Sequence, residues 1–134
     1  MTQLQAAQKG MITDAMRRVA QDENVTPEQV REAIACGRAV IPLNPAHANA
    51  RPVGVGRLFS TKVNANLGRS TTRSGKGDEL EKLQIALDAG ADFVMDLSVG
   101  ADLRAIRQGM LDASPVPLGT VPVYETISRL EGDV

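Results

Sequence analysis

The second half of this chain alternates short apolar runs with amphipathic stretches, and this alternation restricts the fold more than any other feature. The pattern predicts three strands, two helices and the start of a third helix, at residues 61–66, 78–89, 92–97, 101–112, 117–121 and from about Tyr124. Strands that alternate with helices along the chain in this way favour a parallel sheet with right-handed crossovers. We therefore expect an α/β fold from residue 57 onward.

The number of βα units leaves two architectures open. A closed eight-stranded βα barrel needs about 250 residues, whereas this chain has 134. Three βα units form either a small open α/β sheet or the first part of a (β/α)8 barrel of the TIM type. Composition and periodicity do not separate these two architectures.

The first third of the chain is expected to be helical. Residues 2–9 and 14–23 have helical patterns, and Thr13 is a suitable N-cap for the second of them. The clearest start is Thr26-Pro27-Glu28-Gln29, which combines a capping threonine, a first-turn proline and a glutamine at the capping-box position.

A stretch rich in proline, glycine and asparagine separates the two halves. It covers residues 42–56 and predicts a loop or a series of turns. We therefore divide the chain into a helical N-terminal segment with its loop, residues 1–56, and a partial βα region, residues 57–134.

Charge and hydropathy exclude several classes of partner. The formal net charge is −1 and no block of like charge occurs, so nothing favours nucleic acid or an anionic membrane as a partner. No apolar run approaches the length of a membrane helix, about 18 residues, and the N-terminus lacks a hydrophobic signal segment. We expect a cytoplasmic protein. The single cysteine, Cys36, cannot form an intrachain disulfide or hold a metal cluster by itself.

Polar or polarisable side chains occur near the carboxyl end of each predicted strand. Asn66 lies 29 positions before Met95, and Met95 lies 29 positions before Tyr124. Equal steps in a βα series predict that these residues lie side by side at the carboxyl ends of the strands, where ligands bind in parallel α/β proteins. Asp96 and Ser98 follow Met95, and Asp96 has a second explanation as a cap of the segment after it.

The same residues also have ordinary structural explanations. Asn66 is compatible with a turn, Met95 with core packing, and Tyr124 with the start of a helix. His47, in a proline-rich loop, is expected to be an exposed or locally bonded imidazole, and Cys36 an inert small residue. No Ser-His-Asp, H-E-x-x-H or C-x-x-C pattern occurs in the sequence.

Four stretches in a fixed order resemble the phosphomethylpyrimidine synthase family. They are GRAVIPLNPAH (37–47), VNANLGRS (63–70), GADFVMDLSVG (90–100) and SPVPLGTVPVYE (114–125). The resemblance covers almost the whole chain. It implies a carbon–carbon lyase of thiamine biosynthesis, which converts aminoimidazole ribotide to hydroxymethylpyrimidine phosphate by S-adenosylmethionine radical chemistry with a four-iron four-sulfur cluster and zinc.

The resemblance also implies a fold and a set of roles. The family has a (β/α)8 barrel with an N-terminal region, of which this chain would hold the first three βα units. Carried over by motif, Asn66, Met95 and Tyr124 contact the ribotide, and no catalytic residue is identified. The family's cluster cysteines and zinc histidines lie beyond the matched region. This chain is therefore expected to ligate no cofactor and to be inactive alone.

Two origins remain open for a chain with this resemblance. One is a fragment or one piece of a split synthase, which would act with a complementary C-terminal half or within a homodimer. The other is a truncated paralogue that acts as a non-catalytic phosphosugar-binding or regulatory α/β module. Arg69 departs from the family pattern, because the family usually has asparagine at this position.

Overall fold

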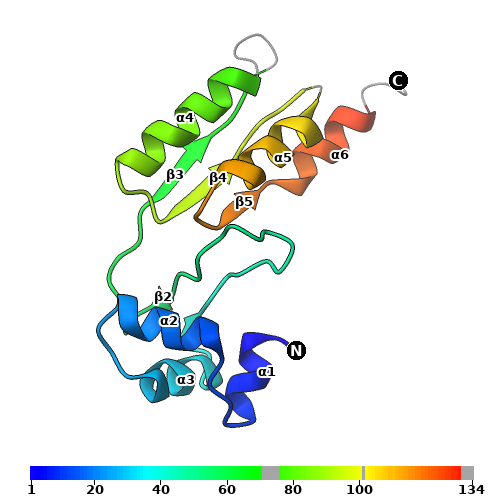
Figure 1. Ribbon diagram of the computed structural model, residues 1–134. Helices are drawn as coiled ribbons and strands as arrows, with labels where there is room; N and C mark the ends of the chain where they lie inside the picture. The colour runs from blue at the N-terminus through cyan, green and yellow to red at the C-terminus, as the bar shows by residue number, and fades with distance from the viewer. Residues whose placement is uncertain (71–75, 101, 131–134) are drawn as a thin grey trace. The chain divides into compact units, whose positions relative to one another are not determined.

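The chain folds into two compact units, which are described separately below (Figure 1). The computed structural model describes residues 1–70, 76–100 and 102–130. The first unit contains residues 1–45 and 51–62, and the second contains residues 46–50 and 63–134. The division of the chain at residue 56 stays a prediction.

Three helices with threonine caps form most of the first unit. They are α1 (Gln3–Gln8), α2 (Asp14–Asp22) and α3 (Pro27–Ala35). Each preceding threonine accepts a hydrogen bond from a backbone N–H of the first turn, which satisfies one of the donors that a helix start leaves free. The caps predicted at Thr13 and Thr26 are confirmed, and Thr26 forms a full capping box with Gln29.

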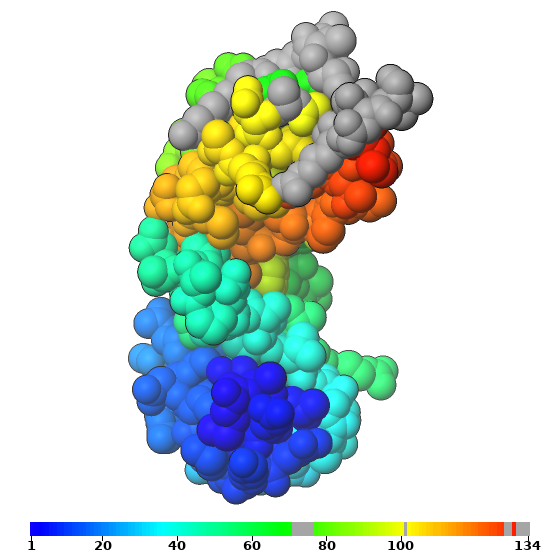
Figure 2. Space-filling view, turned by 90° about the vertical axis from the view of Figure 1, so that its right-hand side faces the viewer, coloured from blue at the N-terminus to red at the C-terminus, as the bar shows by residue number. Residues whose placement is uncertain are grey.

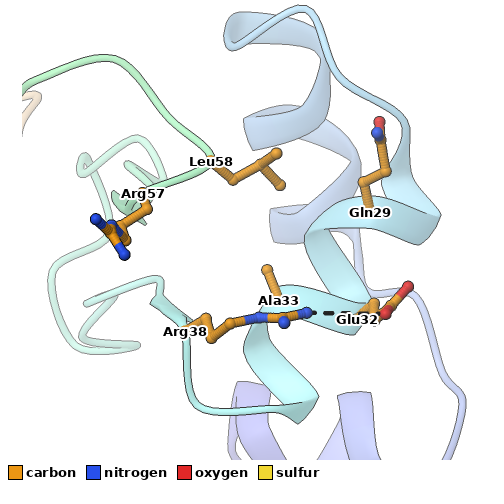
Figure 3. A pocket seen from close by; sticks show the side chains of 6 residues that line it. All are labelled: Gln29, Glu32, Ala33, Arg38, Arg57 and Leu58. Atoms are coloured by element: carbon orange, nitrogen blue, oxygen red, sulfur yellow. Dashed lines mark ion pairs between the residues drawn. The ribbon is translucent and has the colours of Figure 1, made fainter.

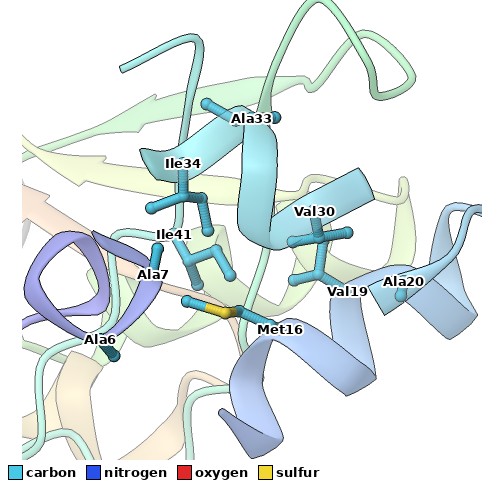
Figure 4. Packing of buried hydrophobic residues seen from close by; sticks show 10 residues of the cluster. Ala6, Ala7, Met16, Val19, Ala20, Val30, Ala33, Ile34 and Ile41 are labelled. Atoms are coloured by element: carbon cyan, nitrogen blue, oxygen red, sulfur yellow. The ribbon is translucent and has the colours of Figure 1, made fainter. Parts of the chain in front are cut away.

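The core of the first unit is aliphatic. Met16, Val19, Val30 and Ile34 of α2 and α3 pack together with Ile41, and all are buried (Figure 4). The short helix α1 covers this core with Ala6 and Ala7, and its outer residues form the dark blue surface in Figure 2.

A small antiparallel pair of strands completes the first unit. Strand β1 (Ala39–Val40) pairs with β2 (Val55–Gly56). The sequence predicted only a loop or turns over residues 42–56, where β2 lies. Strand β2 is two residues long and contains a glycine, so it carries no alternating pattern that sequence reasoning detects.

The second unit is a three-stranded parallel sheet with helical connections. Its elements are β3 (Asn64–Leu67), α4 (Lys76–Asp88), β4 (Phe93–Asp96), α5 (Leu103–Ala113), β5 (Leu118–Thr120) and α6 (Pro122–Leu130). The order of elements agrees with the predicted alternation, although the strands are shorter than expected. Residue 101, the first of the predicted helix 101–112, lies outside the described residues.

The strands are ordered β3-β4-β5, so neighbours in the chain are neighbours in the sheet. Helices α4 and α5 pack side by side on one face, where Leu83, Ile106 and Met110 surround Val94 of β4 (Figure 1). Three consecutive parallel strands without a reversal of order occur both in a sector of a βα barrel and in one half of a doubly wound sheet, so the strand order is compatible with either. Within the described residues the sheet is open and forms no closed barrel.

Candidate functional site

Asn66 and Met95 lie side by side at the carboxyl ends of β3 and β4. They are register partners in the parallel ladder, as the 29-residue step between them predicted. Register partners project from the same face of a sheet, and Val94, one residue away, projects into the helix-covered core on the other face. Asn66 and Met95 therefore share the face opposite α4 and α5.

Gly119 of β5 continues this row of residues. It is the register partner of Met95, and a Cβ placed on Gly119 would lie only 3.1 Å from Met95 Cε. The Met95 side chain therefore extends over β5 and is half-buried. A small residue at position 119 gives the flexible thioether room beside Asn66.

The two asparagines of β3 are linked to each other. Asn64 Nδ2 donates a hydrogen bond of 2.7 Å to Asn66 Oδ1. Both side chains are exposed, two residues apart on the same face of the strand. The bond fixes the orientation of the Asn66 amide, so that its Nδ2 is the group that Asn66 offers to a ligand as a donor.

Tyr124 does not lie in the row of register partners that contains Asn66 and Met95. It sits in the first turn of α6, and its backbone N–H donates to Val121 O. The equal 29-residue step wrongly predicted that it would lie level with Met95, whose neighbour in β5 is Gly119. The 29-residue spacing is misleading here because β5 ends at Thr120, so residue 124 already belongs to the following helix.

Backbone and side-chain hydrogen bonds join the segments that follow β3 and β4. Arg69 N donates to Ser98 Oγ at 3.1 Å, and Val99 N donates to Arg69 O at 2.9 Å. Asp96 Oδ1 accepts from Ser98 N at 2.9 Å, a local bond of the kind that the capping explanation of Asp96 requires. Asp96 and Ser98 are both buried, and their bonds hold the two strand ends together.

A network of charges connects β4, α5 and α6. Arg107 of α5 places Nε 3.7 Å from Asp96 Oδ2 and donates from Nη1 to Glu125 Oε2 at 2.9 Å. Arg104, one turn earlier, donates to Glu125 Oε1 at 3.0 Å. Sequence reasoning missed this network, and the only available signal was the spacing of two arginines on one helix face.

A second ion pair supports the end of β3 from α4. Glu79 is fully buried, and Lys82 donates to its Oε1 and, at 3.3 Å, to the carbonyl oxygen of Gly68. Lys82 therefore connects the helix to the turn that follows Asn66. A buried carboxylate is tolerated where such a cation balances it.

His47 is buried and bonded to a distant part of the chain. Its Nε2 lies 2.9 Å from the backbone oxygen of Ser114, which is also buried. Because a carbonyl oxygen only accepts, Nε2 is the nitrogen that donates this bond. The expectation of an exposed or locally bonded imidazole is wrong, because a contact across 67 positions leaves no local signal.

The clearest electrostatic perturbation lies in the first unit, at Glu23. Burial raises the pKa of this carboxyl, but hydrogen bonds from Lys62 and Ser60 outweigh burial and leave the pKa below its ordinary value. Lys62 Nζ lies 2.7 Å from Glu23 Oε1, and both side chains are nearly buried. The pair fastens the segment before β3 to the end of α2.

Two hollows in the first unit offer little chemistry. One, of about 300 Å³, is lined by Gln29, Glu32, Ala33, Arg38, Arg57 and Leu58. Figure 3 shows that Arg38 points toward Glu32 while Arg57 points away, so the two guanidinium groups do not converge on an anion. The other, of about 600 Å³, is lined mostly by apolar side chains beside α1 and β1.

The residues of this chain do not match the donor set of an iron–sulfur cluster. Such clusters are held by several cysteine thiolates, and Cys36, an exposed residue at the end of α3, is the single cysteine of the sequence. In the described part of the chain, no group of three or more His, Cys, Asp or Glu residues is arranged to hold a metal ion. None of the described helices combines the length and apolar character needed to cross a membrane.

Comparisons with known proteins agree with the resemblance seen in the motifs. The model of the Radical SAM ThiC family matches residues 2–133. Phosphomethylpyrimidine synthases from Halobacterium salinarum and Thermus thermophilus are 57% and 54% identical over 130 residues, which cover 97% and 96% of this chain. The synthase of Moorella thermoacetica is 53% identical over 125 residues.

The matched region is a small part of these relatives. It covers 27% of the Halobacterium protein, 30% of the Thermus protein and 29% of the Moorella protein. The chain thus spans less than a third of the length of the curated relatives that it matches. On the evidence of the family model, which covers nearly every residue, this chain belongs to the Radical SAM ThiC family.

Proposed function

We propose that this chain supplies part of the substrate-binding surface of a phosphomethylpyrimidine synthase, with Asn66, Met95 and Tyr124 as contacts to aminoimidazole ribotide. The observation that carries the proposal is the pairing of Asn66 with Met95 on one face of a parallel sheet, at the carboxyl ends of the strands. Membership of the Radical SAM ThiC family supports the choice of substrate.

The side chains suit the substrate that the family suggests. An asparagine amide both donates and accepts, which fits an aminoimidazole or a ribose. Met95 offers a soft apolar wall, and Tyr124 offers a ring and a hydroxyl. None of the three is an obvious general acid or base. In this proposal they hold the substrate, and groups outside this chain supply the radical chemistry.

The cofactors of the family would then be bound elsewhere. S-adenosylmethionine and a four-iron four-sulfur cluster are implied by the family, and zinc by the resemblance. One cysteine does not supply the thiolates of a cluster. We propose that the (β/α)8 barrel is completed by a segment corresponding to the rest of the relatives, more than two-thirds of their length, which also carries the cluster and metal ligands.

Calorimetric titration of the chain with aminoimidazole ribotide tests the binding role. We expect measurable binding, weakened about fivefold or more by Asn66→Ala, because a lost hydrogen bond to a buried ligand group costs about 1–3 kcal/mol. Gln84→Ala is the matched control, since Gln84 bears an amide on α4 and its side chain, among the described residues, bonds to Asp88 in its own helix.

Selectivity separates this function from the alternative of a general phosphosugar-binding module. A synthase site should bind aminoimidazole ribotide more tightly than ribose 5-phosphate, and Asn66→Ala should remove the preference. Equal affinity for both ligands would favour the general module. Absence of any ribotide binding, both alone and with the complementary part of a relative, would refute the proposed role.

A further inference from the structure

The charge network of the second unit reaches the residues that directly follow two of the proposed contacts. Asp96 follows Met95 in β4, and Glu125 follows Tyr124 in α6. Arg107 lies between these two carboxylates, 3.7 Å from Asp96 Oδ2 and 2.9 Å from Glu125 Oε2. A single guanidinium group thus spans the distance between the sheet and the helix that carries Tyr124.

The burial of the three side chains distinguishes this link from an ordinary surface ion pair. The Asp96 side chain is 1% exposed, that of Glu125 20% and that of Arg107 24%. Arg107 Nε is buried without a hydrogen bond among the described residues, facing Asp96. Arg104, which contacts only Glu125 in this network, is 78% exposed, and exposed pairs contribute little.

The geometry of arginine explains why this residue can hold two elements at once. Its planar head group presents several N–H donors in a rigid fork, so that one edge faces Asp96 while another bonds to Glu125. Asp96 is itself fixed by Ser98 N, and Ser98 Oγ accepts from Arg69 N. The links therefore run from the end of β3, through the end of β4, to the first turn of α6.

We propose that Arg107 is a positioning residue that sets the place of Tyr124 relative to Met95, by bridging Asp96 and Glu125. Pairing within the sheet does not fix the position of Tyr124, because Tyr124 lies in α6, beyond the end of β5. The importance of this placement for ligand affinity rests on the proposed function, whereas the link itself does not.

The composition of the chain provides a direct measurement of the link. Tyr124 is the only tyrosine and the sequence has no tryptophan, so intrinsic fluorescence reports on Tyr124 alone. In the ligand-free chain, Arg107→Gln is expected to raise the acrylamide quenching constant of Tyr124 about twofold and to lower its anisotropy, as expected of a local release of the helix. Arg104→Gln, the matched control, should remain close to wild type.

Two further variants separate positioning from general loss of stability. Arg107→Lys keeps a cation beside Asp96 but lacks the fork that reaches both carboxylates, so it should loosen Tyr124 with a smaller loss of stability than Arg107→Gln. Glu125→Ala removes the α6 end of the link, together with the exposed Arg104 pair that the Arg104→Gln control tests, and leaves Asp96 paired with Arg107. It should reproduce the quenching change even if Arg107→Gln fails to fold.

The outcomes decide the link and the function separately. Wild-type quenching in both Glu125→Ala and Arg107→Lys would overturn the link, as would an equal change in Arg104→Gln. With aminoimidazole ribotide, Arg107→Lys should weaken binding about tenfold. If the wild-type chain and its complemented form bind no ribotide, the proposed function fails, while the quenching results still decide the link.

Discussion

Within the second unit, a buried imidazole helps to attach the loop of residues 46–50 to the end of α5. His47 is buried and donates to Ser114 O, at the point where α5 ends and the chain turns toward β5. Ser114 also exchanges hydrogen bonds with Val116 through its hydroxyl. Two segments far apart in sequence are therefore joined through one buried carbonyl group, whose loss of a partner would be costly.

The His47 contact leads to a prediction about the replacement side chain. His47→Ala should lower the free energy of unfolding by about 2–3 kcal/mol, because it removes a buried donor and leaves a small cavity. His47→Gln should restore part of that loss, since its amide N–H reaches a similar position. Urea denaturation measures both. Asn49→Ala removes an exposed bond to Asp112 O and should cost less than His47→Ala; equal costs would contradict the prediction.

The lowered pKa of Glu23 predicts that the stability of the chain depends on pH. Its pKa is lowered in the folded chain from an ordinary value of 4.5, through bonds from Lys62 and Ser60 that outweigh burial. A carboxyl with a lowered folded pKa stabilises the protein above its unfolded pKa, and this contribution is lost as pH falls below about 4.5 toward the folded value. Glu23→Gln should therefore cost about 2 kcal/mol at pH 7 and much less near pH 3.

Urea denaturation at the two pH values tests the Glu23 prediction. Glu32→Gln is the control, because Glu32 forms an exposed pair with Arg38 at 3.8 Å and should have a small effect at either pH. A cost of Glu23→Gln that is the same at pH 7 and pH 3 would show that the charge of Glu23 is not the source of the stabilisation.

At the scale of elements, Gly68 controls how closely β3 and β4 approach at their carboxyl ends. Its φ of 155° is rarely adopted by other residues, and a Cβ there would lie 2.7 Å from the backbone carbon of Leu97. Gly68→Ala should therefore destabilise the chain by about 2–4 kcal/mol, because backbone rather than a flexible side chain must move. Urea denaturation measures the loss.

A second glycine gives this prediction a control with the opposite sign. Gly77 lies within α4, and a Cβ there would meet nothing within 4 Å. Gly77→Ala should stabilise the chain by up to about 0.5 kcal/mol, less than the difference in a helix interior, because Gly77 is the second residue of α4. If both substitutions changed stability in the same direction, close packing at Gly68 would not be the cause.

The features that were predictable from the sequence depend on interactions between residues close together in the chain, whereas those that were missed depend on contacts between distant residues. Thr13, Thr26 and the alternating pattern act within a few residues, so caps and βα order were predictable. The pairing of Asn66 with Met95 followed from a regular repeat. The docking of His47, the bridge through Arg107 and the level of Tyr124 depend on tertiary packing, which leaves no periodic signal in one sequence.

At the scale of the whole molecule, the second unit has an exposed apolar stripe on α6 and an open sheet. Val123, Ile127 and Leu130 recur at helical spacing on α6 and are 53%, 48% and 58% exposed. In the described residues, β5 pairs only with β4. An exposed apolar helix stripe and an unpaired strand edge each favour association, because another chain can cover them.

We therefore expect the isolated chain to associate with itself as its concentration rises, which sedimentation velocity measures. Replacing the α6 stripe with Val123→Thr, Ile127→Gln and Leu130→Gln should lower the association constant about tenfold or more, since burial of each apolar side chain contributes about 1.5–3 kcal/mol. Ile85→Gln removes an equally exposed apolar residue, 61% exposed, from α4 and serves as the control. If the wild-type chain stays monomeric throughout, or if Ile85→Gln has the same effect as the triple substitution, the α6 stripe is not an association surface.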